Sequence, residues 1–322
     1  MAPARKKVII DTDPGIDDAM AILMAFNSPE LEIIGMTTIF GNVSTPLATT
    51  NALYLCELGG LHIPVAEGSS EPLKGGVPRI ADFVHGADGF GNINVVSTVK
   101  KSSQKSEQAA CDFLIQKVAD NPGEITIVAL GPLTNVALAI QKDPSFGSNI
   151  DELIVLGGAF FASGNVTPAA EANIFGDPEA ADLVFTAGIN TQVIGINLTT
   201  QVILNEEDLL EIKNSNSKHG DYLYDMTRFY RSWHLSSDGL DGIFLHDPTC
   251  MAAVLNSSLF TYRTGVVRVE TQGLCTGLTV LDMGLKEWVG DNPWVRKPAI
   301  KVGWTVNTTE VKKLVKDLLM RP

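Results

Sequence analysis

Short apolar runs and amphipathic stretches alternate along the first two thirds of this chain. Val8–Ile10 is the first apolar run and predicts a buried strand, which Pro14 and Gly15 separate from the next segment. The apolar residues of that segment recur at helical spacing and share one face. The face consists of Ile16, Met20, Leu23 and Met24. The chain is therefore expected to open with a strand, a tight turn and a helix.

The same alternation predicts the order of the later elements. Strands are expected over residues 33–39, 64–66, 125–130, 153–156 and 193–197. Helices are expected over residues 46–57, 106–120, 136–141 and 177–186. Strands that alternate with helices form parallel sheets through right-handed crossovers. We therefore predict an α/β fold: an open, mostly parallel twisted sheet of the Rossmann-like kind, with helices on both faces.

The last third of the chain is richer in helices. Its apolar and aromatic residues fall at helical spacing, which is typical of a core-facing stripe, although the end of that helix could reach a site. The stripe consists of Tyr222, Leu223, Met226, Phe229, Tyr230 and Trp233. Residues 266–271 and Val280 predict strands at a sheet edge, and Asn307 begins a final helix. No linker or repeat interrupts the pattern, so residues 1–322 are expected to form a single domain.

Glycine becomes frequent from Gly68 to Ile93, and this stretch ends in HGADGFGN at residues 85–92. The composition predicts a long mobile loop, and long loops on compact domains are often functional lids. We expect residues 75–93 to close over a bound ligand and to exclude water.

Composition and charge narrow the class of partner. The 322 residues are 45% hydrophobic and 19% charged, as in an ordinary globular protein that can bury a large core. The net charge of -13 argues against DNA, RNA and anionic membranes, which are bound mainly by lysine and arginine. A neutral or cationic small molecule fits this charge better.

The cysteines show no CxxC spacing and lie in apolar or helical contexts, which predicts reduced and buried thiols. They are Cys56, Cys111, Cys250 and Cys275. The first residues lack the apolar core of a signal peptide, and no run approaches the roughly 18 apolar residues of a membrane span. We therefore expect a cytosolic protein.

Four carboxylates follow the first strand within a short stretch. They are Asp11, Asp13, Asp17 and Asp18. Like charges this close repel one another and raise pKa values, unless a cation or hydrogen bonds offset the repulsion. Carboxylate oxygens are the ligands that Ca²⁺ and Mg²⁺ prefer, so a divalent cation is the first explanation. The alternative is a solvated acidic loop whose aspartates cap a helix.

Other polar residues also follow predicted strands. They are Asn42, Glu171, Asn173, His246 and Asp247. The carboxyl ends of parallel strands meet at one edge of a sheet, so these side chains could share a pocket with the aspartates. Taken singly, each has an ordinary structural explanation. A histidine is often only hydrogen-bonded, and an Asp-Pro pair often only starts a helix.

Several longer motifs run through the chain. The most specific is DTDPGIDDAMAI at residues 11–22. The others are TTIFGN at 37–42, HGADGFG at 85–91, ALGPLTNVA at 129–137, AEANIFGDPEAA at 170–181 and HDP at 246–248. On these motifs the chain resembles the inosine-uridine-preferring nucleoside hydrolases, also called nucleoside N-ribohydrolases, over nearly its whole length, and the plant members most of all.

This resemblance implies an activity, a cofactor and a setting. The expected reaction is hydrolysis of the N-glycosidic bond of purine or pyrimidine ribonucleosides, which gives ribose and a free nucleobase. The expected cofactor is a tightly bound Ca²⁺, and the expected assembly is a homodimer or a homotetramer. Such an enzyme would act in nucleoside catabolism and salvage.

Matched position by position, the resemblance also implies roles for individual residues. Calcium would be held by Asp13, Asp18, Asp247 and the backbone carbonyl of Leu130. Asp13 would in addition be the base that activates the metal-bound water. The ribose hydroxyls would be held by Asp17, Asn42, Glu171 and Asn173. Asp11 would mainly support the loop.

Physical reasoning supports this scheme. Calcium accepts about six to eight oxygen ligands, so it can hold carboxylates, the vicinal 2′ and 3′ hydroxyls and a water together. The carboxylates would stabilise the positive charge of an oxocarbenium-like transition state. His246 is implied as the general acid that helps the base to leave. His85, Tyr230, Trp233 and His234 are candidates for contacts with the nucleobase.

Two stretches depart from the family pattern. Leu156 precedes the Gly157-Gly158 pair where many relatives carry a methionine, which leaves the contact beneath the ribose open. Residues 233–244 match poorly, and the nucleobase preference is therefore not transferred.

Two other functions stay open at this point. A phosphatase of the haloacid dehalogenase type uses Mg²⁺ and also places DxD after its first strand, but the threonine or valine expected two places after Asp13 is absent. A non-catalytic nucleoside- or calcium-binding protein is the other. An EF-hand is disfavoured, because Ile22 stands where its loop requires a glutamate.

Overall fold

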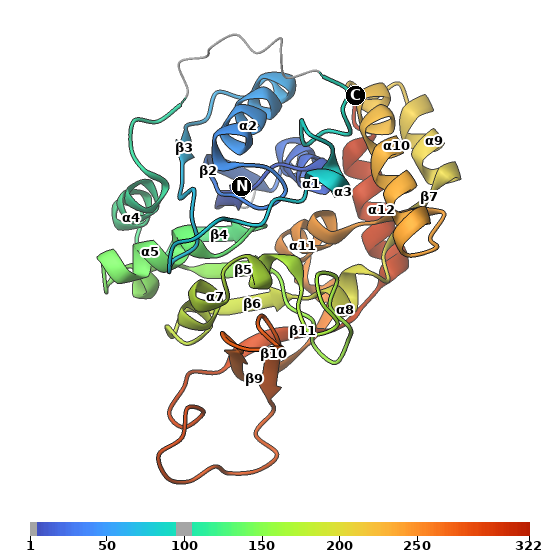
Figure 1. Ribbon diagram of the computed structural model, residues 1–322. Coiled ribbons are helices and arrows are strands. Elements are labelled where there is room, and N and C mark those ends of the chain that lie inside the picture. Colours follow the sequence, from blue (N-terminus) through green and yellow to red (C-terminus); the bar gives the residue numbers. More distant parts are fainter. Residues whose placement is uncertain (1–4, 95–104) are drawn as a thin grey trace.

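The centre of the fold is a nine-stranded sheet, which Figure 1 shows with the helices around it. The computed structural model describes residues 5–94 and 105–322. The strands of the sheet are β1 (Lys6–Thr12), β2 (Leu31–Thr38), β3 (Val65–Glu67), β4 (Ile125–Ala129), β5 (Glu152–Leu156), β6 (Thr191–Ile194), β9 (Phe260–Val269), β10 (Thr279–Asp282) and β11 (Ile300–Val306). A separate two-stranded sheet pairs β7 (Ile203–Asn205) with β8 (Gly242–Phe244).

The strand order places a topological switch point between β1 and β4. The order is β10-β9-β11-β6-β5-β4-β1-β2-β3. All strands from β11 to β3 run parallel, whereas β9 and β10 form an antiparallel edge. The chain moves from β1 outward to β3 and then returns to β4 on the other side of β1. Because the connections diverge there, a crevice opens beyond the carboxyl ends of β1 and β4.

Helices cover both faces of the sheet, as Figure 1 shows. One face carries α1 (Ile16–Asn27), α2 (Thr45–Gly59), α9 (Glu206–Asn214), α10 (Gly220–Ser237), α11 (His246–Leu255) and α12 (Thr308–Leu319). The other face carries α4 (Ala110–Asp120), α5 (Thr134–Lys142) and α7 (Pro178–Phe185). The shorter helices are α3 (Asp82–His85), α6 (Ala172–Gly176) and α8 (Ile196–Thr199).

Successive residues of the central strands pack on opposite faces. In β1, Val8 and Ile10 belong to the core under α1, whereas Ile9 belongs to the core under α5. All three side chains are fully buried. A strand buried on both faces reads as a continuous apolar run, which is why the sequence marks these strands clearly. The predicted fold class is confirmed: a single-domain α/β fold with a mostly parallel sheet.

Several elements are not indicated by the sequence pattern. The strands β7 and β8 were not predicted, because each is only three residues long. The strand β11 was not predicted either, because Gly303 and Trp304 interrupt its alternation of apolar and polar residues. The helix predicted from residue 106 begins at Ala110 instead. Ser106 forms a local turn, in which its hydroxyl accepts a hydrogen bond from the Gln108 N–H at 3.1 Å.

The glycine-rich stretch is only partly a loop. Residues 68–81 contain no helix or strand, but α3 follows, so the expectation of an unbroken loop from Gly68 to Ile93 is wrong. The second half is tied to the body. Asp88 accepts three backbone N–H groups, and the Asn51 amide donates to the Pro14 and Asp88 carbonyls, each at 3.0 Å. Phe90 is fully buried, which anchors the HGADGFG motif to the core.

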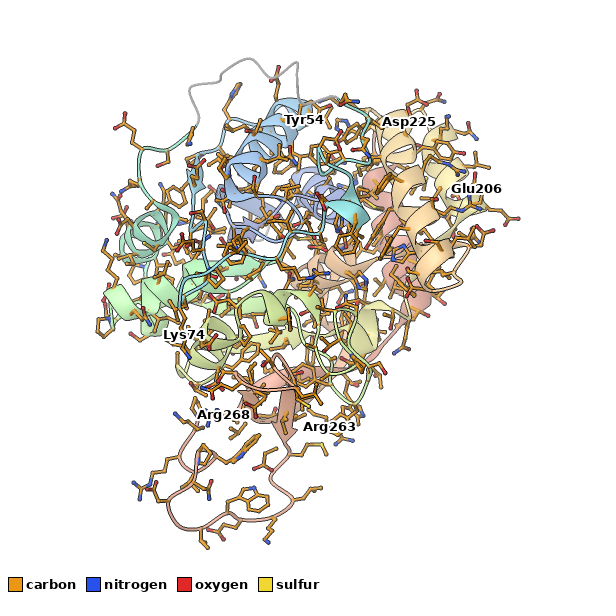
Figure 2. All side chains as sticks on the ribbon, in the orientation of Figure 1. Tyr54, Lys74, Glu206, Asp225, Arg263 and Arg268 are labelled. Atoms are coloured by element: carbon orange, nitrogen blue, oxygen red, sulfur yellow. The ribbon has the colours of Figure 1, made fainter. Side chains whose placement is uncertain are left out.

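Figure 2 labels several charged side chains on the outside of the fold, among them Lys74, Glu206 and Arg268. Arg268 on β9 pairs with Asp182 of α7 at 2.7 Å and so ties the antiparallel edge to a helix of the parallel part. Glu206 at the start of α9 pairs with Arg231 of α10 at 3.2 Å. Among the described residues, no helix is both long enough and apolar enough to cross a membrane.

The burial of α1 leads to a prediction about stability. Leu23 lies in the core with 1% of its surface exposed. Leu23→Ala should lower the free energy of unfolding by about 2–5 kcal/mol, because it leaves a cavity while alanine keeps the helix propensity. Urea denaturation followed by circular dichroism measures the change. Leu235→Ala on α10, where the side chain is 53% exposed, is the matched control. An equal loss of unfolding free energy in the two variants would contradict the buried position of Leu23.

Candidate active site

A cavity of about 460 Å³ opens at the carboxyl edge of the sheet. Its wall contains residues that follow β1, β2, β4, β5 and β6, which is the location expected for the site of an open α/β sheet. The predicted site residues in this wall are Asp17, Asn42, His85, Leu130, Glu171, Asn173, Tyr230, Trp233, His234, His246 and Asp247. The other two, Asp13 and Asp18, are 1% and 0% exposed and interact electrostatically with the carboxylates of the wall.

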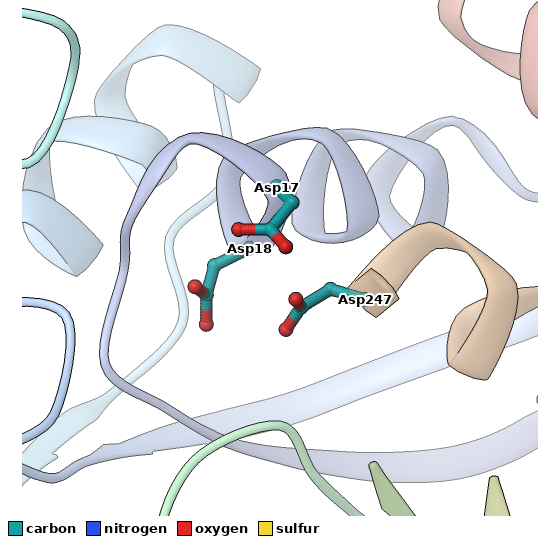
Figure 3. A group of neighbouring side chains, drawn as sticks. All are labelled: Asp17, Asp18 and Asp247. Atoms are coloured by element: carbon teal, nitrogen blue, oxygen red, sulfur yellow. The ribbon is translucent and has the colours of Figure 1, made fainter. Parts of the chain in front are cut away.

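Three carboxylates form the tightest acidic group. Asp17 and Asp18 come from the first turn of α1 and Asp247 comes from the first turn of α11. Figure 3 shows the three side chains converging on one space between the two helices. One oxygen of each lies within 4.8 Å of the others, and all three residues are buried. Sequence reasoning assigned Asp17 to the ribose alone, but the fold places it within this group.

Asp13 lies beside this group in a narrow cradle. Its Oδ2 accepts a hydrogen bond of 2.6 Å from the Asn42 N–H. A Cβ atom at Gly41 would lie 2.1 Å from Asp13 Oδ2, and one at Gly131 would lie 2.6 Å from Asp13 Oδ1. Gly41 has a φ of 154°, which disfavours other residues. The two glycines therefore let the backbone approach the Asp13 carboxylate closely.

Among Asp13, Asp17, Asp18 and Asp247, Asp18 accepts the largest number of hydrogen bonds. Its Oδ1 accepts from the Thr12 hydroxyl at 2.5 Å. Its Oδ2 accepts from the Asn42 amide at 2.7 Å and from the Gly15 N–H at 3.1 Å. These contacts fix the orientation of the side chain and tie the TTIFGN motif to the DTDPGIDD motif.

Asp11 has structural partners and lies outside the acidic group. Its Oδ1 accepts from the Thr37 hydroxyl at 2.6 Å and from the Asn135 amide at 2.8 Å. Thr37 belongs to β2 and Asn135 belongs to α5, so Asp11 joins two elements that flank β1. This placement agrees with the supporting role that the resemblance implies.

Burial is the main influence on the protonation of these carboxyl groups. It raises the pKa of Asp11 to about 6, and together with the charge of Asp17 it raises the pKa of Asp18 to about 7. Burial and neighbouring carboxylates place the pKa values of Asp13 and Asp247 well above the usual range. Burial opposes ionisation of Asp17 too, but His85 and a hydrogen bond with Asp247 lower its pKa. A cation bound here would favour the ionised forms.

The donor atoms of this group fit a hard divalent cation. Within residues 5–94 and 105–322, the buried Oδ1 atoms of Asp13, Asp17 and Asp247 have no hydrogen-bond partner. The Leu130 carbonyl accepts one hydrogen bond, from the Asn173 amide at 2.6 Å, and a carbonyl oxygen has a second lone pair. A set made only of oxygen donors suits Ca²⁺ or Mg²⁺ and does not suit a soft metal.

Glu171 and Asn173 are held by the backbone around them. Glu171 caps α6 and accepts hydrogen bonds from the N–H groups of Asn173 at 2.9 Å and Gly158 at 2.9 Å. The Asn173 amide also donates to the Leu156 carbonyl at 3.2 Å. Burial raises the pKa of Glu171 despite these hydrogen bonds. Both side chains therefore stand in fixed positions in the cavity wall.

A row of aromatic rings forms another part of the cavity wall. The ring centroids are 5.3 Å apart for His85 and Tyr230, 4.2 Å for Tyr230 and His234, and 4.9 Å for His234 and Phe244. The Phe244 and His246 centroids are 5.7 Å apart and complete the row. Tyr230 and His234 lie one helical turn apart on α10, so the end of the predicted stripe does reach the site. A row of aromatic rings suits contact with a planar ring.

Hydrogen bonds orient the polar atoms of this row. His85 Nδ1 accepts from the Ile16 N–H at 3.2 Å, and the Tyr230 hydroxyl donates to Asp17 at 3.2 Å. His246 Nδ1 lies 2.7 Å from the Thr199 hydroxyl. Burial lowers the pKa values of His85 and His246 and lowers that of His234 to about 4.

Sequence reasoning missed several residues of the wall, among them one arginine and two phenylalanines. Arg79 and Phe83 come from the glycine-rich stretch, and Phe244 comes from β8. The Arg79 guanidinium lies 5.3 Å from the Phe83 ring centroid, and that ring lies 5.2 Å from the Trp233 ring. Phe83 precedes the HGADGFG motif by two residues, which is the one signal that could have found it. The sequence carries no comparable signal for Arg79 or Phe244.

Comparison with known proteins agrees with this geometry. The family model of the inosine-uridine preferring nucleoside hydrolases matches residues 8–313. The chain is 60% identical to uridine nucleosidase 1 of Arabidopsis thaliana over 98% of this chain and 94% of that protein. It is also 60% identical to the probable uridine nucleosidase 1 of Oryza sativa subsp. japonica, over 99% of this chain and 98% of the other.

A solved structure agrees as well. A plant nucleoside hydrolase superposes with a TM-score of 0.96 at 52% identity and covers 99% of this chain and 100% of its own. The resemblance to the plant members is therefore confirmed. The motifs, the fold and the position of the acidic group all agree: the chain belongs to the inosine-uridine preferring nucleoside hydrolase family, and it is a hydrolase of N-glycosyl bonds.

Proposed function

We propose that this protein hydrolyses ribonucleosides to ribose and a free nucleobase, and that uridine is among its substrates. The observation that carries the proposal is the buried group of Asp17, Asp18 and Asp247, which lies beside Asp13 and meets the aromatic row where Tyr230 donates to Asp17. The names of the plant relatives, which are uridine nucleosidases, support the choice of uridine. Purine nucleosides remain candidates, because the aromatic row offers a surface to any planar base.

The acidic group suits a calcium ion and a ribose together. We propose that Asp13, Asp18, Asp247 and the Leu130 carbonyl hold Ca²⁺, with Asp17 beside them. A bound Ca²⁺ supplies Lewis-acid chemistry for water and for vicinal hydroxyls. The oxygens that lack partners, on Asp13, Asp17 and Asp247, are the ones available for this purpose. Asp18 would bind through Oδ1, which accepts only the Thr12 hydroxyl and keeps a free lone pair, whereas its Oδ2 already accepts two hydrogen bonds.

Asp13 is the proposed general base. Its cradle of Gly41 and Gly131 leaves Oδ1 without a partner while the Asn42 N–H holds Oδ2. Asp13 takes the proton of the attacking water, and the water oxygen bonds to C1′ of the ribose as the C1′–N bond breaks. The carboxylates around the sugar stabilise the positive charge that develops on it.

The remaining wall residues bind the two halves of the substrate. Asp17, Asn42, Glu171 and Asn173 are proposed to hold the ribose hydroxyls, and a 2′-deoxyribose would leave a buried polar group unpaired. On the other side His85 and Trp233 contact the nucleobase, and His246 assists its departure. Of the expected lid, residues 75–93, only the first part, residues 75–81, is proposed to close over the base, because Phe90 and Asp88 anchor the second half to the core.

Assembly and location are proposed from the resemblance. We propose a homodimer or homotetramer that works in the cytosol in nucleoside catabolism and salvage. None of the four cysteines is paired in a disulfide, which is compatible with this location, but the expectation of buried thiols is wrong for Cys275, which is exposed.

The activity itself is tested with a nucleoside panel. Incubation of the purified protein with uridine, inosine and xanthosine should release ribose, which a reducing-sugar assay measures. 2′-Deoxyuridine should react far more slowly, because it lacks a hydroxyl that the acidic group requires. Release of phosphate from a nucleotide without release of ribose would indicate a phosphatase instead. Binding of nucleosides or calcium without any hydrolysis would indicate a binding protein.

Asp13→Asn tests the proposed base. The substitution keeps the size of the side chain and removes the proton acceptor, so kcat should fall by about 10²–10⁴-fold. Asp120→Asn, at the exposed end of α4, is the matched control and should leave kcat unchanged. Circular dichroism confirms that both variants fold. Turnover by Asp13→Asn within a few-fold of the unchanged protein would rule out this assignment.

Removal of the metal tests the cofactor. Treatment with a chelator should lower the thermal midpoint and abolish turnover, and added Ca²⁺ should restore both, because a ligand that binds the folded state stabilises it. In Asp247→Asn the response to Ca²⁺ should be lost. The metal-free form of that variant should melt at or above the midpoint of the metal-free unchanged protein, since one repelling charge is gone. A full calcium response in Asp247→Asn would contradict the proposed ligand set.

A further inference from the structure

Thr199 is a buried polar residue that touches the site without lining the cavity. It ends the short helix α8, which follows β6, and none of its surface is exposed. Its Oγ1 lies 2.7 Å from His246 Nδ1, although the two residues are far apart in the sequence. No sequence motif points to Thr199, and the acidic group does not use it.

The direction of this hydrogen bond depends on the surroundings of the hydroxyl. Thr200, the next residue, donates its hydroxyl to the Ile196 carbonyl at 2.7 Å, as threonines in helices often do. Among the described residues, the Thr199 hydroxyl has no hydrogen-bond partner other than His246 Nδ1. If His246 Nδ1 carried the hydrogen, the buried hydroxyl hydrogen of Thr199 would lack an acceptor, which is unfavourable. The hydroxyl therefore donates and Nδ1 accepts.

From this contact we propose that Thr199 is a positioning residue that holds the hydrogen of the neutral His246 imidazole on Nε2. When Nδ1 accepts a hydrogen bond, the second ring nitrogen carries the hydrogen. His85 follows the same rule, because its Nδ1 accepts from the Ile16 N–H, which can only donate. The inference rests on the proposed function, in which His246 faces the leaving nucleobase.

The consequence concerns the departure of the base. As the C1′–N bond breaks, its electron pair moves onto the nucleobase, and the His246 Nε2–H donates a hydrogen bond to that growing negative charge. No proton has to leave His246 in this step, so the base departs with the electron pair and takes its proton from water afterwards. Fixed donors aimed at developing charge are an effective form of catalysis. The effect of Thr199 on kcat is then largest for nucleobases that leave poorly without a hydrogen bond to the developing negative charge.

Thr199→Val tests the proposal by its dependence on the leaving group. Valine has nearly the same shape as threonine and lacks the hydroxyl, so kcat for uridine should fall about tenfold, the size of one hydrogen bond. The kcat for 4-nitrophenyl β-D-riboside should stay within about twofold, because nitrophenolate is a stable leaving group. Thr199→Ser should restore the uridine rate. Thr191→Val is the matched control and should leave both rates unchanged. Thr191 is also buried, with 2% of its surface exposed, but its hydroxyl donates to the Ile189 carbonyl at the end of β6 away from the site.

The tautomer can be observed without any turnover. Nitrogen-15 NMR of the histidine rings, with His246 assigned through His246→Asn, should show Nε2–H in the unchanged protein and a shift toward Nδ1–H in Thr199→Val. An Nδ1–H tautomer in the unchanged protein would overturn the inference. An equal loss of kcat on uridine and on the nitrophenyl riboside would overturn it too, since that result indicates a general structural role. Failure of the unchanged protein to hydrolyse any nucleoside would instead overturn the proposed function, and the NMR result would still decide the tautomer.

Discussion

Electrostatic repulsion among buried carboxylates is the constraint around which this molecule is built. Asp17, Asp18 and Asp247 converge within 4.8 Å, and Asp13 lies beside them. Burial alone raises the pKa values of such groups, and each neighbour adds to the effect. The arrangement is held because α1 and α11 are packed into the same core, so that their first turns cannot separate without exposing apolar side chains. A divalent cation is the simplest partner for oxygens held in this way.

The packed carboxylates limit which residues can occupy the neighbouring positions. Gly41 and Gly131 are needed because any Cβ would strike the Asp13 carboxylate. Thr12, Gly15 and Asn42 hold Asp18 through three hydrogen bonds. The motifs TTIFGN and ALGPLTNVA therefore belong to the same site as DTDPGIDD, although their own residues carry little charge.

The cavity divides into two chemically different halves. One half is acidic and is held by strand ends and helix starts, which suits a sugar that develops positive charge. The other half is a row of aromatic rings on α10, β8 and α11, which suits a planar base. The site residues in this second half come from segments where side-chain packing, not the sheet, sets the geometry. The two halves meet where the Tyr230 hydroxyl donates to Asp17 and where His246 precedes Asp247.

The sequence by itself determined the parallel sheet, the position of the acidic turn and part of the cavity wall, because buried strands, glycine turns and charged residues leave local patterns. Asp13, Asp18, Asn42 and Asp247 could be named for this reason. Only the tertiary structure decided that Asp17 joins the tightest acidic group, that Phe90 anchors half of the glycine-rich stretch, and that Arg79, Phe83 and Thr199 reach the site or its histidine. Those contacts join elements that are distant in the chain. The hydrophobic period and the residue spacing within one segment do not indicate which side chains of another segment will pack against it.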